Sequence, residues 1–284
     1  MKCLIVIPHI FHPKEKGKYS SQNEEKRKSK EIALKKSTIE NLCRHNKEHW
    51  IHSSLGINGK VVNRKSEVKD AFEIKIQLYT NSNASLCNKI EENERLEIIN
   101  INTEDYMQVP AIASRRLIEQ RKGYDILGYI EDDILIEDGE FFNKIRFFLK
   151  SLDKEYVVLP HRCEYIKNKG DVILSGDPDG GRPDLFWDTK EKININWPTG
   201  QKTIYRATNP HSGCFFIGSE QAEILYEYWS RKNWKSKYQL SGPLEHAASG
   251  RIIMNFKIFK TVPEDYRFFM VRHQDELWKN HEFE

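Results

Sequence analysis

The alternation of apolar and polar residues along the chain predicts a series of β-strands. Residues 4–7 and 126–130 are continuous apolar runs, which is typical of strands covered on both faces. Residues 96–101 and 156–160 are two further predicted strands. Residues 72–79 alternate between apolar and charged side chains, which predicts a strand with one face in water.

Apolar residues at helical spacing fill several of the intervals between these strands. The predicted helices cover residues 29–43, 109–121, 141–149 and 219–229. Repeated alternation of strand and helix favours a mostly parallel central sheet flanked by helices. The pattern therefore predicts an α/β fold.

Two long stretches break this pattern. Residues 13–30 are polar and basic, and we expect them to form a loop with little order. Residues 167–202 are rich in Gly, Pro and Asp, and we expect a functional loop because long insertions in compact chains tend to carry function. Further on, residues 243–250 predict a short helix and residues 252–259 a long strand.

Three consecutive carboxylates, Glu131, Asp132 and Asp133, follow directly on the apolar run 126–130. Adjacent acids repel one another, so they must be solvated, paired with basic groups or neutralised by a divalent cation. Ligands of open α/β sheets bind just beyond the carboxyl ends of the strands, where these side chains would project. The pattern predicts a Mg²⁺ or Mn²⁺ site that holds the phosphates of a nucleotide-bearing donor, with a solvated acidic turn as the alternative.

The length of the chain and its net charge indicate how large its domain is and whether it binds nucleic acid. The chain has 284 residues, enough for one large α/β domain, and its 45 basic and 42 acidic residues give a formal net charge of +3. A protein held to nucleic acid mainly through phosphates would be more basic, so we expect no nucleic-acid partner.

The five cysteines form no C-x-x-C pair, which indicates free thiols in a reducing compartment. No apolar run approaches ~18 residues, so we expect no integral membrane segment and a cytoplasmic protein, either free or peripherally bound to a membrane.

Four short motifs follow one another in a fixed order. They are Glu131-Asp132-Asp133, Ser212-Gly213-Cys214, Leu244-Glu245-His246 and His273. In this order they resemble the D-x-D-type motif, the glycine-containing acceptor loop, the x-E-D-like acid and the late metal-binding histidine of the GT-A glycosyltransferases, which are metal-dependent nucleotide-sugar transferases. The resemblance spans nearly the whole chain. It implies a Rossmann-like GT-A fold with one catalytic domain over 1–284, in which 1–138 form the donor half and 139–284 the acceptor half.

The resemblance implies a metal site on the acidic motif. Asp133 would coordinate Mn²⁺ or Mg²⁺ directly, and His273 would complete the shell. An imidazole ligand suits Mn²⁺ better than Mg²⁺, which prefers oxygen. The motif is Glu-Asp-Asp rather than Asp-x-Asp, which leaves open whether Glu131 or Asp132 supports Asp133. We assign Glu131 to the metal and Asp132 to the donor.

The resemblance also implies donor and acceptor contacts. Pro8 and His9, at the end of the first strand, resemble the family's backbone contact to the base of the donor. Arg115 and Arg116 are candidate partners of the diphosphate or of Asp133. The predicted acceptor-binding residues are Asn209, His211, Ser212 and Gly213.

An inverting transfer needs a general base within hydrogen-bond reach of the acceptor hydroxyl. Glu245 is the candidate for this role, and the alternative is an acid that merely complements a helix dipole. His246 stands where the family has a second acid. Whether the transfer is inverting or retaining stays open, although we expect inversion.

The combined interpretation is a hexosyltransferase-type glycosyltransferase that moves a sugar from a nucleotide-sugar donor to a hydroxyl acceptor, expected to be a glycan in polysaccharide biosynthesis. The first alternative is a nucleotidyltransferase. Such an enzyme is expected to carry a glycine- and lysine-rich phosphate loop after its first strand, and residues 8–12 contain no glycine. The second alternative is a non-catalytic module that binds calcium or carbohydrate through the same acids.

Overall fold

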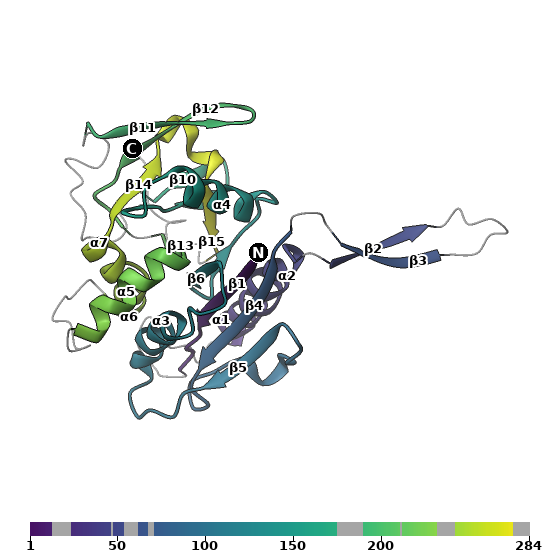
Figure 1. The fold of residues 1–284 in the computed structure, drawn as a ribbon. Coiled ribbons are helices and arrows are strands. Elements are labelled where there is room, and N and C mark those ends of the chain that lie inside the picture. The colour runs from purple at the N-terminus through teal and green to yellow at the C-terminus, as the bar shows by residue number, and fades with distance from the viewer. Residues whose placement is uncertain are drawn as a thin grey trace.

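A five-stranded sheet forms the centre of the protein, in a computed structural model that describes residues 1–12, 24–46, 48–53, 62–67, 71–174, 190–210, 212–231 and 242–274 (Figure 1). Its strands, in spatial order, are β13 (Cys214–Gly218), β6 (Ile126–Ile130), β1 (Lys2–Pro8), β4 (Glu73–Thr80) and β5 (Leu96–Asn100). Four of them are parallel, and β13 runs antiparallel to β6 at one edge. The predicted α/β class with a mostly parallel sheet is thus confirmed.

Strand β1 shows why its sequence is apolar throughout. Cys3, Ile5 and Ile7 lie in one hydrophobic core cluster, while Leu4 and Val6 lie in another, because successive side chains of a strand point to opposite faces. All five side chains are fully buried. The central sheet is therefore covered on both faces, as its continuous apolar runs predicted.

One face is covered by an N-terminal helical segment and by α4 (Phe141–Ser151). The N-terminal segment consists of α1 (Glu24–Ile32), a π-helical stretch η1 (Ala33–Glu40) and α2 (Asn41–Arg44). Residues 24–30 are therefore helical, and the prediction of a loop there was wrong; the rest of that predicted loop, 13–23, lies outside the described residues. Leu34, Ile39 and Leu42 hold the segment on the sheet, so tertiary packing stabilises a helix whose first turns are almost entirely polar.

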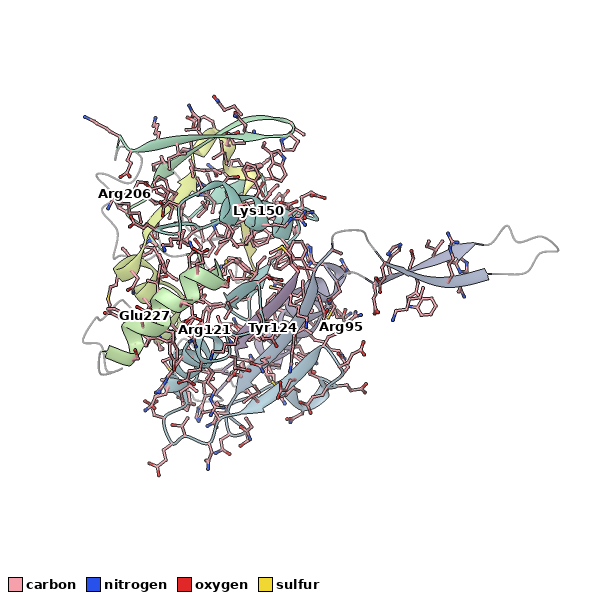
Figure 2. The ribbon with its side chains drawn as sticks, in the orientation of Figure 1. Arg95, Arg121, Tyr124, Lys150, Arg206 and Glu227 are labelled. Atoms are coloured by element: carbon pink, nitrogen blue, oxygen red, sulfur yellow. The ribbon has the colours of Figure 1, made fainter. Side chains whose placement is uncertain are left out.

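The other face is covered by α3 (Val109–Glu119), α5 (Ser219–Arg231) and α7 (Arg251–Asn255). Arg121, just after α3, ties two of these helices together: its Nε lies 2.8 Å from Glu223 Oε1, and its guanidinium lies 3.5 Å above the Tyr226 ring (Figure 2). Short helices precede α7, namely α6 (Pro243–Glu245) and the π-helical η5 (His246–Gly250). Residues 252–255 were predicted to be strand, but they are helical, and Ile252 packs into the core cluster beneath α3 and α5.

Two four-stranded sheets lie beside the central sheet. The first has the order β10 (Gly170–Ile173), β9 (His161–Ile166), β15 (Met270–His273), β7 (Ile134–Leu135). The second has the order β11 (Lys192–Trp197), β12 (Gly200–Arg206), β14 (Lys257–Thr261), β8 (Tyr156–Val158). The described ends of the predicted irregular stretch 167–202 are therefore mostly in strands, while its middle, 175–189, lies outside the described residues.

A two-stranded hairpin, β2 (Glu48–Ser53) paired with β3 (Val62–Glu67), extends away from the rest of the molecule in Figure 1. At its base, Glu48 forms an ion pair with Arg95, which is labelled in Figure 2. The remaining short helices are η3 (Cys87–Lys89), η4 (Tyr106–Gln108) and η6 (Pro263–Phe268).

Strand β4 corrects one further prediction. Its alternating pattern predicted a face in water, yet Gln77 on that face is buried and donates to Gln120 at 3.0 Å, because the end of α3 covers it. Lys75 on the same face pairs with Glu97 of the next strand at 3.2 Å.

Among the described residues, no helix has the length and apolar character needed to span a bilayer.

Candidate functional site

The acidic loop Glu131 to Asp133 joins the central sheet to a neighbouring sheet, since β6 ends at Ile130 and β7 begins at Ile134. Backbone bonds hold it at both ends: Glu131 N–H donates to the Gly213 carbonyl at 2.8 Å, and Gln274 N–H donates to the Asp133 carbonyl at 3.0 Å. The three acids are only 5%, 9% and 9% exposed. The alternative of a solvated acidic turn is therefore wrong, and each carboxylate needs a compensating partner.

Asp132 has its partner in His9, at the carboxyl end of β1. His9 Nδ1 lies 2.6 Å from Asp132 Oδ2, and His9 Nε2 accepts a hydrogen bond from Leu86 N–H at 3.0 Å. Because Nε2 is an acceptor, Nδ1 carries the proton and donates to the carboxylate. The buried His9 ring therefore fixes the orientation of Asp132. Pro8, predicted with His9 to contact the donor base, pairs with Tyr79 inside the sheet, and that contact stays a prediction for both residues.

Asp133 lies next to two cationic side chains. His273 Nε2 is 3.6 Å from Asp133 Oδ2, and Lys30 Nζ is 3.1 Å from the same oxygen. Burial raises the pKa of Asp133, but the charges of Lys30 and His273 outweigh burial and hold this pKa well below its usual range. For His273 burial has the opposite effect and lowers the pKa, because it disfavours the charged imidazolium. Asp133 and Glu164 outweigh burial and raise the pKa of His273 to about 9.

Glu164 on β9 orients His273 from the side opposite Asp133. Its Oε1 lies 2.7 Å from His273 Nδ1, and both side chains are almost completely buried. A carboxylate on one ring nitrogen leaves the other directed at Asp133, which is the usual arrangement behind a metal-binding histidine. Nothing in the sequence near Glu164 marked it as a site residue, because strand pairing across the fold creates this contact.

Glu131 is the most deeply buried of the three acids, and its pKa is raised to about 8. Burial is the main cause; the charge of Asp133 and then that of Glu245 add to it, while Arg162 and His273 oppose it. Glu245, Arg162 and His273 are thus close enough to Glu131 for their charges to shift its pKa. The structure brings the predicted base, Glu245, and the three predicted metal ligands into one region.

The N-terminal helical segment packs directly on the acidic loop. Thr38 Oγ1 donates to the Asp132 carbonyl at 2.9 Å, and Ile136 N–H donates to Asn41 Oδ1 at 3.2 Å. Lys30 reaches Asp133 from the same segment. Sequence reasoning missed all three residues, since Lys30 lies in a basic stretch predicted to be loop and no local signal relates Thr38 or Asn41 to the acids.

The glycine loop before β13 contacts the acidic loop. Gly213 has φ +66°, and a Cβ at this position would lie 2.6 Å from Ile134 Cδ1 and 3.3 Å from Glu131 Oε2. Any other residue would therefore strain the backbone and force Ile134 to move. Ser212 is fully buried and donates to the Pro160 carbonyl at 2.6 Å, so its hydroxyl holds the loop rather than facing an acceptor. Asn209 is also buried, and His211 lies outside the described residues. Acceptor binding by Asn209, His211 and Gly213 stays a prediction.

Glu245, the predicted base, lies at the end of the short helix α6 and is half-buried. Its Oε2 turns back toward Gly242, where any added Cβ would collide with it. His246, next to it, has a lowered pKa because of burial and the nearby charge of Arg251.

Arg115 and Arg116 were predicted to contact the diphosphate or Asp133. Both are exposed on α3, and Arg115 pairs with Glu119 at 2.7 Å. Among the described residues, the cations recorded at Asp133 are Lys30 and His273, so the pairing of either arginine with Asp133 was wrong. Their contact with a diphosphate stays a prediction.

The donor set fits a divalent cation in chemical type, with carboxylates from Glu131 and Asp133 and an imidazole from His273. Within the described part of the chain, Glu131 Oε1 and Asp133 Oδ1 are buried without a hydrogen-bond partner. In the same part of the chain, no group of three or more His, Cys, Asp or Glu side chains is already arranged around a metal position. In this arrangement the ammonium of Lys30 and the imidazole of His273 both lie against Asp133 Oδ2.

Neither a protein-family model nor a curated protein matches the sequence. The structure is similar to that of GalNAc-T7 with UDP, GalNAc and Mn²⁺, with a TM-score of 0.47 and 12% identity over 96% of this chain and 43% of that one. It is also similar to a mannose-1-phosphate geranyltransferase from Thermus thermophilus, with a TM-score of 0.40 and 9% identity over 92% of this chain and 73% of that one.

A third similar structure is a 4-diphosphocytidyl-2C-methyl-D-erythritolsynthase from Anaerococcus prevotii, with a TM-score of 0.38 and 10% identity over 94% of this chain and 93% of that one. The chain spans less than half the length of the GalNAc-T7 chain. All three TM-scores are below 0.5, so these similarities carry no argument about activity.

Proposed function

We propose that this protein is a divalent-metal-dependent glycosyltransferase that moves a sugar from a nucleoside-diphosphate donor to a hydroxyl group of a glycan. The observation that carries the proposal is the buried acidic loop at the carboxyl end of β6, where Asp133 faces His273 and two carboxylate oxygens have no partner among the described residues. Burying such carboxylates is costly unless a ligand completes the site. A cation that binds a diphosphate would do so.

Three residues would hold the cation: Asp133, Glu131 and His273, with Mn²⁺ favoured over Mg²⁺ because one ligand is nitrogen. When bound, such an ion neutralises the negative charge of a departing nucleoside diphosphate as a Lewis acid. The protein's own part is orientation. His9 holds Asp132 in one position, and Glu164 holds the His273 ring with Nε2 directed at Asp133.

Glu245 is the proposed general base of an inverting transfer. The acceptor oxygen forms a bond to the anomeric carbon as the bond from that carbon to the donor phosphate breaks, and the electron pair leaves with the diphosphate. Glu245 takes the proton of the acceptor hydroxyl. A positioned carboxylate in this role contributes roughly 10²- to 10⁴-fold to the rate.

A thermal-shift measurement tests the proposal. Purified protein is heated with UDP, GDP, CDP or ADP, each with and without Mn²⁺. The expected result is a nucleotide-dependent rise in Tm that requires Mn²⁺, since only a ligand that prefers the folded state stabilises it. Stabilisation by metal alone, with no nucleotide effect, would indicate a binding module and contradict the proposal.

The nucleotide that passes this test selects the donors for an activity assay. Nucleoside-diphosphate sugars carrying that base are incubated with the protein and Mn²⁺, and release of the free nucleoside diphosphate is measured. Transfer requires this product. Formation of a nucleotide-sugar from a nucleoside triphosphate and a sugar phosphate would instead identify a nucleotidyltransferase.

A further inference from the structure

Lys30 is the residue at the site that the proposed chemistry leaves unexplained. Its Nζ lies 3.1 Å from Asp133 Oδ2, the oxygen that also faces His273 Nε2 at 3.6 Å. A divalent ion bound between Asp133 and His273 would lie against this same carboxylate oxygen, because it is the one nearest Nε2, whereas Oδ1 has no partner among the described residues. The ammonium of Lys30 therefore already contacts the Asp133 oxygen that such an ion would approach.

The path of the chain shows that this contact is built into the fold. Lys30 lies near the end of α1, which continues without interruption into η1 and α2. Thr38 of that continuation bonds to the backbone of Asp132, and Asn41 bonds to the backbone of Ile136, just after β7. The two contacts therefore flank Asp133 in the sequence. The helical segment is thus tied to the loop, and it carries the lysine to the carboxylate.

The two cations beside Asp133 differ in how firmly they are held. The His273 side chain is 4% exposed and is fixed from behind by Glu164 at 2.7 Å. The Lys30 side chain is 28% exposed and ends a flexible four-carbon stem. The lysine side chain therefore has a route from Asp133 into solvent once another cation neutralises the carboxylate, whereas the histidine ring is held in place.

We propose that Lys30 is an internal counter-ion that occupies the cation position on Asp133 in the free protein and is displaced when a divalent metal binds. The inference rests on the proposed metal-dependent function. It adds that Lys30 competes with the metal for Asp133. Lys30 keeps the buried carboxylate neutralised when no metal is present. The same contact weakens metal binding, because the metal must first break it.

Titration calorimetry with Mn²⁺ alone tests this directly on the full chain. Lys30→Gln removes the charge and keeps most of the stem, so we expect Mn²⁺ to bind at least tenfold more tightly than to the unmodified protein. Lys28→Gln is the matched control, because Lys28 is an exposed lysine on the same helix, and its affinity for Mn²⁺ should not change. Equal or weaker Mn²⁺ binding by Lys30→Gln overturns the inference.

A second measurement needs no substitution. Lysines of the unmodified protein are acetylated briefly with and without Mn²⁺, and each site is quantified by mass spectrometry. Displacement of Lys30 predicts that Mn²⁺ raises its labelling severalfold while labelling of Lys28 stays constant. Unchanged labelling of Lys30 at saturating Mn²⁺ contradicts the displacement.

Two different results would separate the counter-ion role of Lys30 from the metal-dependent function. Equal Mn²⁺ affinity of the unmodified protein and Lys30→Gln would remove only the counter-ion role. No Mn²⁺ binding by either protein would remove both the counter-ion role and the metal-dependent function.

Discussion

Glu164 and His273 share a buried hydrogen bond of 2.7 Å, although 109 residues separate them in the sequence. The contact arises because β9 and β15 pair in parallel, with Cys163 opposite Arg272, which places the next residue of each strand side by side. The carboxylate fixes which ring nitrogen of His273 faces Asp133. Glu164 is thus a positioning residue for the proposed metal site.

Glu164→Ala should weaken Mn²⁺ binding by roughly 10- to 100-fold, because loss of such a partner lets the imidazole turn. Titration calorimetry measures the affinity. Glu137→Gln is the control, since Glu137 pairs at 2.8 Å with Arg272, the neighbour of His273, and is half-exposed. Equal losses in both variants would mean that Glu164 acts only through the stability of this strand.

Asp133→Asn should abolish metal-dependent binding of the donor nucleotide while the protein stays folded, because an amide cannot supply the charge of the proposed ligand. Circular dichroism and a nucleotide titration with Mn²⁺ check both parts. Asp138→Asn is matched to it, as Asp138 also follows β6 and pairs with a lysine, Lys144, at 2.6 Å. Unchanged nucleotide affinity in Asp133→Asn would count against the central assignment.

Glu245→Gln should leave donor binding nearly intact and lower turnover by roughly two to four orders of magnitude, the usual weight of a general base. Glu220→Gln separates this role from the helix dipole, since Glu220 is an exposed acid in the first turn of α5. Steady-state kinetics of both variants provide the measurement. Full activity of Glu245→Gln would remove Glu245 from the mechanism.

Gly213→Ala should destabilise the protein by about 2–5 kcal/mol, since alanine at positive φ costs about 1–2 kcal/mol and the clash with Ile134 adds about 1–3 kcal/mol. Gly170→Ala is the control, because Gly170 has φ +82° with nothing within 4 Å of an added Cβ. It should cost only about 1–2 kcal/mol. Urea unfolding measures both, and equal costs would show that the contact with Ile134 gives way freely.

His161 should make stability fall as the pH falls below neutrality. Burial, and next the charge of Lys260, lower its pKa from 6.5 to about 3. The unfolded chain therefore takes up a proton between these pH values and the folded protein does not. Between these pH values, His161 therefore lowers the free energy of unfolding by about 1.4 kcal/mol for each unit that the pH falls. Above about pH 7.5 it has no such effect.

Urea unfolding of the unmodified protein and of His161→Gln at about pH 7.5 and about pH 5 isolates this contribution, since the other titrating groups are common to both. The unmodified protein should lose about 2 kcal/mol more than the variant between these pH values. An equal loss would show that His161 is protonated in the folded state.

The predictable part of the fold and site was encoded locally. The apolar run ending at Ile130 and the acids after it sit next to one another in sequence, so the strand and the acids at its carboxyl end could both be predicted. The burial of these acids could not, because a solvated acidic turn has the same sequence pattern. Lys30 and Glu164 could not, because strand pairing and helix packing bring them to the site from 103 and 109 residues away. The helix at residues 24–30 was missed for a related reason, since Leu34, Ile39 and Leu42 anchor it from further along the chain.

The site lies on the last described strand as much as on the first. Strand β15 pairs with β7 directly after the acidic loop, with His273 opposite Ile134. A growing polypeptide thus lacks the histidine until residue 273 has left the ribosome, whatever has folded before it. Under the proposed function, a product that terminates before β15 lacks a metal ligand and should bind neither Mn²⁺ nor the metal-dependent donor.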